Sequence, residues 1–298
     1  MIQTSQSAGS GAANGTIRLV IAIPARLGST RLPRKPLALL KGKPLIERVA
    51  DRVSLCVSQL YATFGLTPDD VLTFVATDST DIEQALKASG MLTVMTPSEL
   101  TSGTDRILSA IDHLPSQLHQ RLSPETLVIN LQGDEPFFSM TDVESLIRNM
   151  FDSPELPMGT LAFERSDPEM FFKTSVVKVV CDGLQQALYF SRSPIPWPRE
   201  FLGASESVAQ MQNQMGSIQN FPFLQHVGIY AYRMDALRRF THLQSRFLEQ
   251  TEGLEQLRAL EAGWKIKIIR SFEPPFGIDT PEDLQRAELH LSDQGLSS

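Results

Sequence analysis

Short apolar runs alternate with segments of helical period along the first half of the chain. The unbroken apolar runs predict buried strands at residues 19–23, 71–76, 92–95 and 127–131. Apolar side chains spaced for one helix face predict helices at residues 44–57, 82–89, 105–113 and 141–150. Thr141 and Glu144 are predicted to form a capping box at the start of the last of these. The alternation is typical of an α/β domain whose largely parallel sheet is covered on both faces.

The pattern changes after about residue 155, where strand-like runs follow one another without a long helix between them. They cover residues 158–163, 176–180 and 187–190, and the Asp182–Gly183 step predicts a hairpin between the last two. Further strands are predicted at 227–232 and 265–269, and further helices at 254–262 and 281–290. Residues 202–222 are rich in Gln, Ser, Asn and Met without a period, so we expect a surface loop there.

Composition and charge exclude several classes of protein. The chain has 298 residues, of which 42% are hydrophobic, enough for a substantial core, and its formal net charge is -7. Such a chain lacks the basic face that general nucleic-acid binding requires. Cys56 and Cys181 lie in apolar surroundings without a CxxC or HExxH motif, which excludes a disulfide scaffold and argues against structural zinc. The apolar runs are too short for a membrane span and residues 1–16 resemble a disordered tail, so we expect a soluble cytoplasmic protein that binds no membrane.

A basic loop follows the first predicted strand directly. Beyond Pro24 it carries small residues, hydroxyls and four cations: Gly28, Ser29, Thr30, Arg26, Arg31, Arg34 and Lys35. Guanidinium groups bind phosphate oxygens in pairs, a lysine ammonium supplies a point charge, and prolines stiffen the loop. The Walker A and GxGxxG spacings are absent. The loop therefore predicts a polyphosphate site of another kind, the alternative being a solvated basic loop.

Two acidic turns supply candidate metal ligands. Asp134 follows the strand at residues 127–131, and open α/β sheets place ligands at the carboxyl ends of their strands. In the segment 276–284, Thr280 and Asp283 form a predicted helix cap that leaves Asp279 free to meet Asp134. Mg²⁺ typically takes one or two carboxylates together with phosphate oxygens. The basic loop and the two acidic turns together predict Mg²⁺-dependent chemistry on a nucleoside triphosphate. The alternative is that the first turn is an ordinary acidic turn and the second only starts a helix.

At these residues the chain resembles the bacterial sugar-acid cytidylyltransferases. The matching blocks occur in family order from Leu19 to Leu289: IPARLGSTRLPRKPL, VATD (75–78), SGTDR (102–106), NLQGDEPF (130–137), VKVVCDGLQQALYFSRSPIPWPR (177–199), HVGIYAYR (226–233), LEQLRALEAGWKI (254–266) and IDTPEDL (278–284). The blocks ALYFSRSPIPWPR and HVGIYAYR resemble the branch that acts on 3-deoxy-manno-octulosonate (Kdo).

The resemblance implies a Rossmann-like nucleotide-diphospho-sugar transferase fold, with a mixed, mostly parallel central sheet and a smaller β-rich dimerisation lobe. Residues 17–298 would form one domain, with a nucleotide-binding part over 17–155, a sugar-binding and dimerisation lobe over 156–250 and a closing αβ part over 251–298. The implied reaction is transfer of CMP from CTP to the anomeric hydroxyl of Kdo for lipopolysaccharide biosynthesis, with pyrophosphate released. Mg²⁺ is the implied cofactor and a homodimer the implied assembly.

The resemblance also assigns roles by position. It places the CTP phosphates on Arg26, Ser29, Arg31 and Lys35, cytosine and ribose on Ser102, Gly103 and Thr104, and Mg²⁺ on Asp134 and Asp279. Arg26, Lys35 and Asp134 are the catalytic candidates. The sugar acid is expected among Arg106, Gln132, His226, Tyr230, Glu255 and Gln256, where Arg106 or a protonated His226 would compensate its carboxylate. By residue type alone, His226 and Tyr230 are core candidates, and Glu255 and Gln256 a solvated helix face.

Three positions depart from the family pattern. Gln225 stands where Arg precedes the histidine, Arg34 where Gly is usual, and Phe276 where a small residue is usual. One rival interpretation is the same reaction with another sugar, such as 8-amino-Kdo or a nonulosonic acid. A binding protein without turnover is disfavoured because the phosphate and metal residues are present, and a nicotinamide dehydrogenase because GxGxxG is absent.

Overall fold

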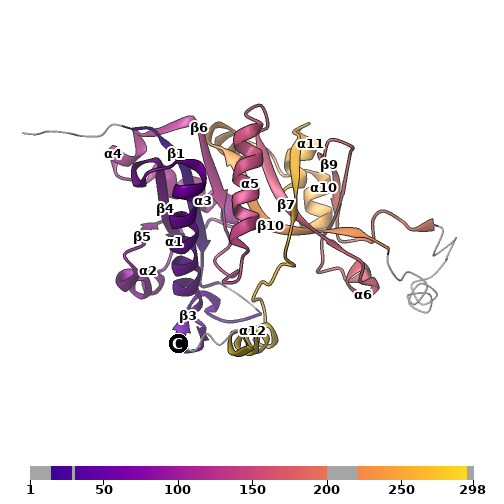
Figure 1. Ribbon diagram of the computed structural model, residues 1–298, viewed down its shortest axis with the longest axis horizontal. Helices are drawn as coiled ribbons and strands as arrows, with labels where there is room; N and C mark the ends of the chain where they lie inside the picture. Colours follow the sequence, from indigo (N-terminus) through magenta and orange to yellow (C-terminus); the bar gives the residue numbers. More distant parts are fainter. Residues whose placement is uncertain (1–14, 29–30, 200–220, 294–298) are drawn as a thin grey trace, which may run out of the picture.

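A computed structural model describes residues 15–28, 31–199 and 221–293 and shows a long central sheet with helices packed around it (Figure 1). The strands within these residues are β1 (Ile17–Ala25), β4 (Val71–Thr77), β5 (Leu92–Met95), β6 (Leu122–Asn130), β7 (Met158–Arg165), β8 (Lys178–Cys181), β9 (Ala187–Ser191), β10 (Phe223–Arg233) and β11 (Ile266–Ser271). A separate small hairpin consists of β2 (Leu39–Leu40) and β3 (Lys43–Pro44).

The helices fill most of the intervening sequence. They are α1 (Leu45–Phe64), α2 (Thr80–Leu86), α3 (Gly103–Asp112), α4 (Ser116–His119), α5 (Met140–Asp152), α6 (Pro168–Phe172), α9 (Met234–His242), α10 (Phe247–Glu252), α11 (Leu257–Glu261) and α12 (Pro281–Asp293). Single 3₁₀ turns occupy Lys35–Leu37, Pro68–Asp70 and Lys87–Ser89. Among the described residues, no helix combines the length and the apolar character that a membrane crossing requires.

The sheet is mixed, with a parallel core. Its main path runs β11-β7-β10-β6-β1-β4-β5, and β8 and β9 extend from β10. Strand β1 is parallel to both β4 and β6, whereas β10 is antiparallel to β6 and β7. The predicted mixed sheet with parallel core strands is confirmed, and so is the hairpin, because β8 pairs antiparallel with β9.

Both faces of the core strands are covered, as the sequence predicts. Along β1, Leu19, Ile21 and Ile23 pack on one side with residues of α1 and α5, and Val20 and Ala22 pack on the other side with residues of α3 and α9. Figure 1 shows α1 and α5 side by side on the same face of the sheet. This alternation follows from the period of two in a strand whose two faces are both buried.

Three sequence predictions are corrected at element ends. Strand β1 continues through Pro24, which is paired with Ala76, because a proline near a strand end costs few ladder hydrogen bonds. The cap of α5 is Ser139, whose hydroxyl accepts the N–H of Asp142 at 3.3 Å, so the capping box at Thr141 and Glu144 is wrong. The predicted helix at residues 254–262 is only the short α11, and the preceding α10 was missed.

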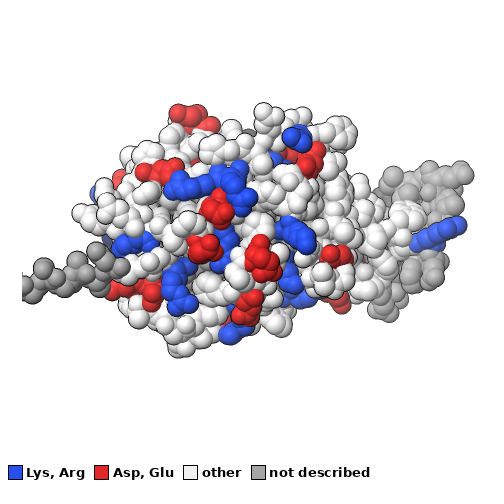
Figure 2. Space-filling view, turned by 90° about the horizontal axis from the view of Figure 1, so that it is seen from above, with Lys and Arg blue, Asp and Glu red and all other residues white. Residues whose placement is uncertain are grey.

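Helix α12 closes the carboxyl edge of the parallel strands. Its Ala287 and Leu291 pack with Ile278 and with Leu40 and Leu45 of the β2–α1 region, apart from the two main cores. Figure 1 shows α12 next to β3, away from the other helices. The last helix of the chain is thereby brought to the loop that follows β1. Figure 2 shows another face of the molecule, on which acidic and basic side chains intermingle.

Candidate active site

The ends of β1 and β6 bring the basic loop and the first acidic turn into contact. Gly133 lies so close to β1 that a Cβ there would stand 3.0 Å from the carbonyl oxygen of Pro24 and 3.3 Å from Ile46 Cδ1. Glycine therefore permits a close approach that another residue would prevent. The result places Asp134, the next residue, beside the loop that carries Arg26 and Lys35.

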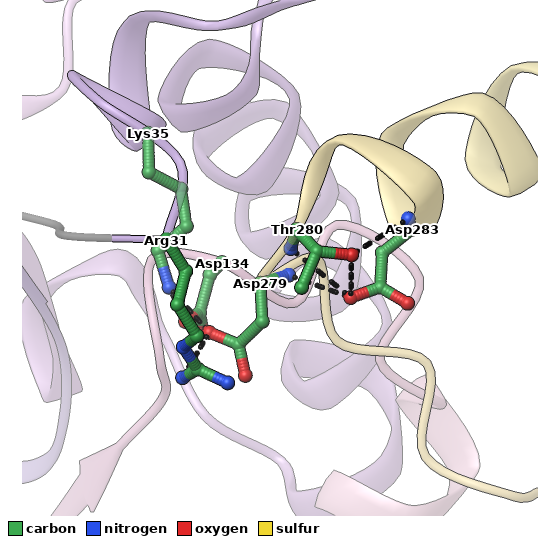
Figure 3. Close-up of polar contacts among 6 residues, drawn as sticks. All are labelled: Arg31, Lys35, Asp134, Asp279, Thr280 and Asp283. Carbon is green, nitrogen blue, oxygen red and sulfur yellow. Dashed lines mark hydrogen bonds and ion pairs between the residues drawn. The ribbon is translucent and has the colours of Figure 1, made fainter.

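Lys35 joins the two predicted metal aspartates (Figure 3). Its ammonium donates to the carboxylates of Asp134 and Asp279, the second at 2.9 Å, and Arg31 pairs with Asp279 at 3.1 Å. Burial lowers the pKa of Lys35, but the two carboxylates more than offset it, so its pKa lies above the ordinary value and the amine stays charged. The prediction that Asp134 and Asp279 face one another is confirmed.

The predicted cap at the start of α12 is also confirmed. The Asp283 carboxylate accepts the N–H groups of Asp279 at 3.2 Å and Thr280 at 3.1 Å, and the Thr280 hydroxyl accepts the N–H of Asp283 at 3.2 Å (Figure 3). These bonds satisfy the exposed donors of a helix start without the Asp279 side chain. A further backbone bond, from Ile278 N–H to the Asp134 carbonyl at 3.0 Å, ties the two acidic turns together.

Glu135 follows Asp134 directly, after the end of β6, but the sequence analysis gave it no role of its own. Burial and the charges of Asp134 and Asp279 raise its pKa to about 8, with Lys35 opposing the shift. A carboxyl with such a pKa carries its proton at pH 7 and adds no charge to the cluster. The sequence shows that Glu135 is next to Asp134, but it does not show how deeply Glu135 is buried.

A first pocket of about 410 Å³ opens around this cluster. It is lined by most of the residues predicted for the nucleotide and the metal: Arg26, Arg31, Lys35, Ser102, Gly103, Asp134 and Asp279. Ser102 caps α3 by accepting the N–H of Asp105 at 3.0 Å, so the start of that helix faces the pocket. Free N–H groups and the dipole of a helix start favour an anion. Ser29 lies outside the described residues.

Arg34 does not join the other loop cations. Its guanidinium pairs with Asp81 at 2.7 Å, and both side chains are largely exposed. Its backbone is left-handed, with φ of 53°, which explains why glycine suits this position. Of the four loop cations predicted to bind a polyphosphate, Arg26, Arg31 and Lys35 line this pocket and Arg34 does not.

A second pocket of about 450 Å³ shares a wall with the first. Thr101, Ser102, Gly103 and Gln132 line both pockets, and the second is also lined by Thr104, Tyr230 and Glu255. Thr104 was predicted to contact the nucleotide, but its hydroxyl donates to Glu255 Oε2 at 3.0 Å in the second pocket. The shared wall means that ligands in the two pockets would lie next to each other.

Two buried polar atoms near this second pocket have no partner in the described part of the chain. They are Oε1 of Glu255 and Nε2 of Gln256. Burial raises the pKa of Glu255, and its contacts with Ser102 and Thr104 oppose the shift. Since buried polar groups in native proteins are normally bonded, an orphan acceptor at a pocket wall indicates a ligand that donates to it. The alternative of a solvated helix face does not fit these two residues.

An ion pair of the second pocket was missed from the sequence. Arg258 binds Glu249 through two hydrogen bonds of 2.8 and 2.6 Å, and both residues line the pocket. They belong to α11 and α10, and the short polar α10 carries no pattern that predicts a helix. Such a bidentate pair fixes the wall that contains Glu255.

Arg106 is placed differently from its predicted role. It is 2% exposed, and its two terminal nitrogens donate to Asp78, Thr96, Pro97 and Leu100 at distances from 2.6 to 3.4 Å. Those four acceptors match the four donors of the two nitrogens. The guanidinium therefore holds the segment from Thr96 to Leu100, and although Arg106 lines the first pocket, these two nitrogens have no free edge for a substrate carboxylate.

His226 is not protonated in the folded protein. Burial lowers its pKa to about 3, its ring packs against Phe190 and Tyr230, and Nε2 lies 3.1 Å from the Thr160 hydroxyl. In the ligand-free protein the ring is therefore neutral, and a positive charge on His226 opposite a sugar carboxylate stays a prediction. A neutral ring can still orient a ligand through hydrogen bonds.

This neutral state predicts how stability depends on pH. Unfolded histidine titrates near pH 6.5, so between that pH and about 3 the unfolded state binds the extra proton. We expect the free energy of unfolding to fall as the pH is lowered below about 6.5, and to fall less in His226→Gln. Urea titrations of both proteins from pH 7.5 to 4.5 measure this. Equal losses in the two proteins would show that His226 does not carry the effect.

Comparisons with known proteins agree with this arrangement. A family model described as "Cytidylyltransferase" matches residues 20–268. The chain is 43% identical over 275 residues to a 3-deoxy-manno-octulosonate cytidylyltransferase of Thermodesulfovibrio yellowstonii, covering 92% of this chain and 98% of the relative. It is 38% identical to the protein of the same name from Escherichia coli, covering 93% of this chain and 97% of that protein.

Solved structures show the same fold. A CMP:2-keto-3-deoxy-manno-octonic acid synthetase complexed with CTP has a TM-score of 0.74 at 37% identity, with 93% of this chain and 99% of that chain covered. A 4-diphosphocytidyl-2C-methyl-D-erythritol synthase from Anaerococcus prevotii has a TM-score of 0.54 at 14% identity, with 94% and 99% covered. The second likeness concerns the fold alone.

Proposed function

The chain belongs to the cytidylyltransferase family, and we propose that it transfers CMP from CTP to the anomeric hydroxyl of Kdo, releasing pyrophosphate. The observation that carries the proposal is the pair of pockets with a common wall. One combines cations with two aspartates and suits a triphosphate. The other is polar, with an orphan carboxylate oxygen, and suits the hydroxyls of a sugar.

In the first pocket the chain's own charges bind and orient CTP. Arg26 and Arg31 line this pocket, and we assign them to phosphate oxygens, with backbone donors from the start of α3. We assign Lys35 to the negative charge that grows on the departing pyrophosphate. The sugar hydroxyl attacks the α-phosphorus, an oxygen–phosphorus bond forms, and the bond to pyrophosphate breaks opposite to it. The hydroxyl proton passes to a carboxylate of the site, for which Asp134 is our candidate.

The residues present fit Mg²⁺. Asp134 and Asp279 converge on one nitrogen, so the same two carboxylates can meet on one cation, and within the described residues no third His, Cys, Asp or Glu joins them as a ligand group. Two carboxylates completed by phosphate oxygens are a common Mg²⁺ donor set. The ion would offset charge on the phosphates and position them.

In the second pocket we assign the sugar acid to Gln132, Tyr230 and Glu255, with His226 and Gln256 behind them. Glu255 also bonds Thr104 of α3, the helix whose first residues line the nucleotide pocket. This contact supports a site in which the sugar hydroxyl and the nucleotide are held against one another.

We further propose a homodimer that works in the cytoplasm, where CTP is available. The β8–β9 hairpin extends the central sheet from β10 within the region 156–250, and it exposes Leu184 and Leu188, at 67% and 61% of their surface. Exposed apolar side chains on one hairpin suit a subunit contact. Residues 202–222, expected as a surface loop, lie almost wholly outside the described residues.

A panel of acid sugars tests the substrate assignment. The protein is incubated with CTP, Mg²⁺ and either Kdo, 8-amino-Kdo or a nonulosonic acid, and pyrophosphate release is followed. We expect Kdo to give the highest kcat/KM. A clear preference for 8-amino-Kdo or a nonulosonic acid would keep the reaction and change the sugar, and release without any sugar would contradict transfer.

The role of Glu255 gives a separate prediction. Glu255→Gln keeps the shape but removes the charged acceptor, so we expect the KM for Kdo to rise about tenfold while the KM for CTP changes less than about twofold. Glu261→Gln is the matched control, since Glu261 lies six residues after Glu255, at the end of α11, but lines neither pocket. Steady-state kinetics with each substrate varied measure both constants. An equal rise in both KM values would contradict a sugar-specific role.

A further inference from the structure

The two acidic turns are joined by a group of aromatic rings that none of the proposed roles uses. Phe137 lies three residues after Asp134, and Phe276 lies three residues before Asp279. The two ring centroids are 5.2 Å apart, and the His290 ring of α12 contacts both, at 5.0 and 5.5 Å. We call Phe137, Phe276 and His290 the aromatic triad.

The triad connects directly to the groups that fix Asp279. The Arg286 guanidinium lies over the Phe276 ring at 5.2 Å and donates to Asp283 at 3.0 Å. Asp283 in turn accepts the backbone N–H of Asp279. Ring contacts of this edge or tilted kind have a preferred geometry and therefore restrict how the two segments can move.

Holding these segments matters because the two aspartates come from distant parts of the chain. Metal and phosphate sites need their ligands held to within about half an ångström. The backbone bond from Ile278 to Asp134 and the shared contact with Lys35 link the turns only at the acids themselves, which leaves their outer parts without a common anchor. The triad adds a second point on the side of α12, where Phe137 and Phe276 pack against the small cluster of Ile278, Ala287 and Leu291.

We propose that the aromatic triad is a positioning unit that holds Asp134 and Asp279 at the spacing a divalent cation and the CTP phosphates require. The inference rests on the proposed function. Phe276 carries most of the connection, because it touches Phe137, His290 and Arg286. This accounts for an aromatic residue at a position where the resembled family usually has a small one.

The test compares CTP binding with and without Mn²⁺ by calorimetry in wild type, Phe276→Ala and Phe276→Leu. The matched control is Phe272→Ala. Phe272 lies in the same segment between β11 and α12 as Phe276, but it is 68% exposed and lies outside the triad. For Phe276→Ala we expect the CTP Kd in EDTA to stay within about twofold of wild type, and the tightening of CTP binding by Mn²⁺ to fall about tenfold. The tightening by Mn²⁺ in Phe276→Leu should lie between the values for wild type and Phe276→Ala. In Phe272→Ala it should equal the wild-type value.

Two results would overturn the proposal. One is unchanged tightening by Mn²⁺ in Phe276→Ala. The other is an equal loss of CTP affinity in EDTA, which would show general damage to the site. Should Phe276→Ala fail to fold, Phe276→Leu decides by the same criteria. A wild-type protein that binds CTP with Mn²⁺ but transfers nothing to Kdo would refute the proposed function. The comparison of CTP binding between wild type and the Phe276 variants would still test the triad.

Discussion

Replacing Asp134 by asparagine is expected to lower kcat about a thousandfold or more while leaving the fold intact. The substitution keeps the size of the side chain but removes one of two carboxylates that meet at Lys35, so divalent binding and the candidate proton acceptor are lost together. Asp134 lies at a strand end and not in either main core, so the variant should fold.

Pyrophosphate release measures the turnover of this variant, and circular dichroism measures its fold. Asp81→Asn is the matched control, since Asp81 forms an exposed pair with Arg34 away from both pockets. We expect this control to keep nearly full activity. Turnover near the wild-type rate in Asp134→Asn would refute the assignment of Asp134 to metal and catalysis.

Lys35→Met is expected to lower kcat about a hundredfold or more and to make the protein more dependent on divalent cations. The methionine cannot neutralise charge on the leaving pyrophosphate. It also leaves Asp134 and Asp279 facing each other without the ammonium between them, and adjacent like charges repel. The melting temperature without metal should therefore fall, and Mg²⁺ should restore more of it than in the wild type.

Thermal unfolding with and without Mg²⁺ measures the second effect, and pyrophosphate release the first. Lys87→Met serves as control, because Lys87 is exposed at the end of α2 and lines neither pocket. An equal stabilisation by Mg²⁺ in Lys35→Met and wild type would show that the two carboxylates do not form the cation site.

The parts of the site that follow directly from chain order were predictable. Strand ends in a parallel sheet share one edge, so the basic loop after β1 and the turn after β6 had to lie together. The reciprocal cap of Thr280 and Asp283 freed Asp279 to meet Asp134, and the structure brings the two acids to the same lysine, Lys35. The parallel core and the phosphate pocket could thus be derived from local patterns and one topological rule, whereas the mixed sheet was implied only by the family resemblance.

The parts that depend on depth and on distant neighbours were not predictable. The sequence around Arg106 does not show whether its guanidinium binds a substrate or the loop from Thr96 to Leu100. Only the fold shows that it binds the loop. His226 loses its proton because rings from β9 and β10 surround it. Glu249 of α10 meets Arg258 of α11, and the short polar α10 carries no periodic signal that predicts a helix.

Following the label of [α-³²P]CTP tests the account most directly. The protein is incubated with this nucleotide, Mg²⁺ and Kdo, and the products are separated and identified by mass. We predict that the label appears in CMP-Kdo with one pyrophosphate released per product, and that omission of Kdo or Mg²⁺ abolishes it. Label that stays in CTP under complete conditions, or that appears as free CMP regardless of Kdo, would contradict the account.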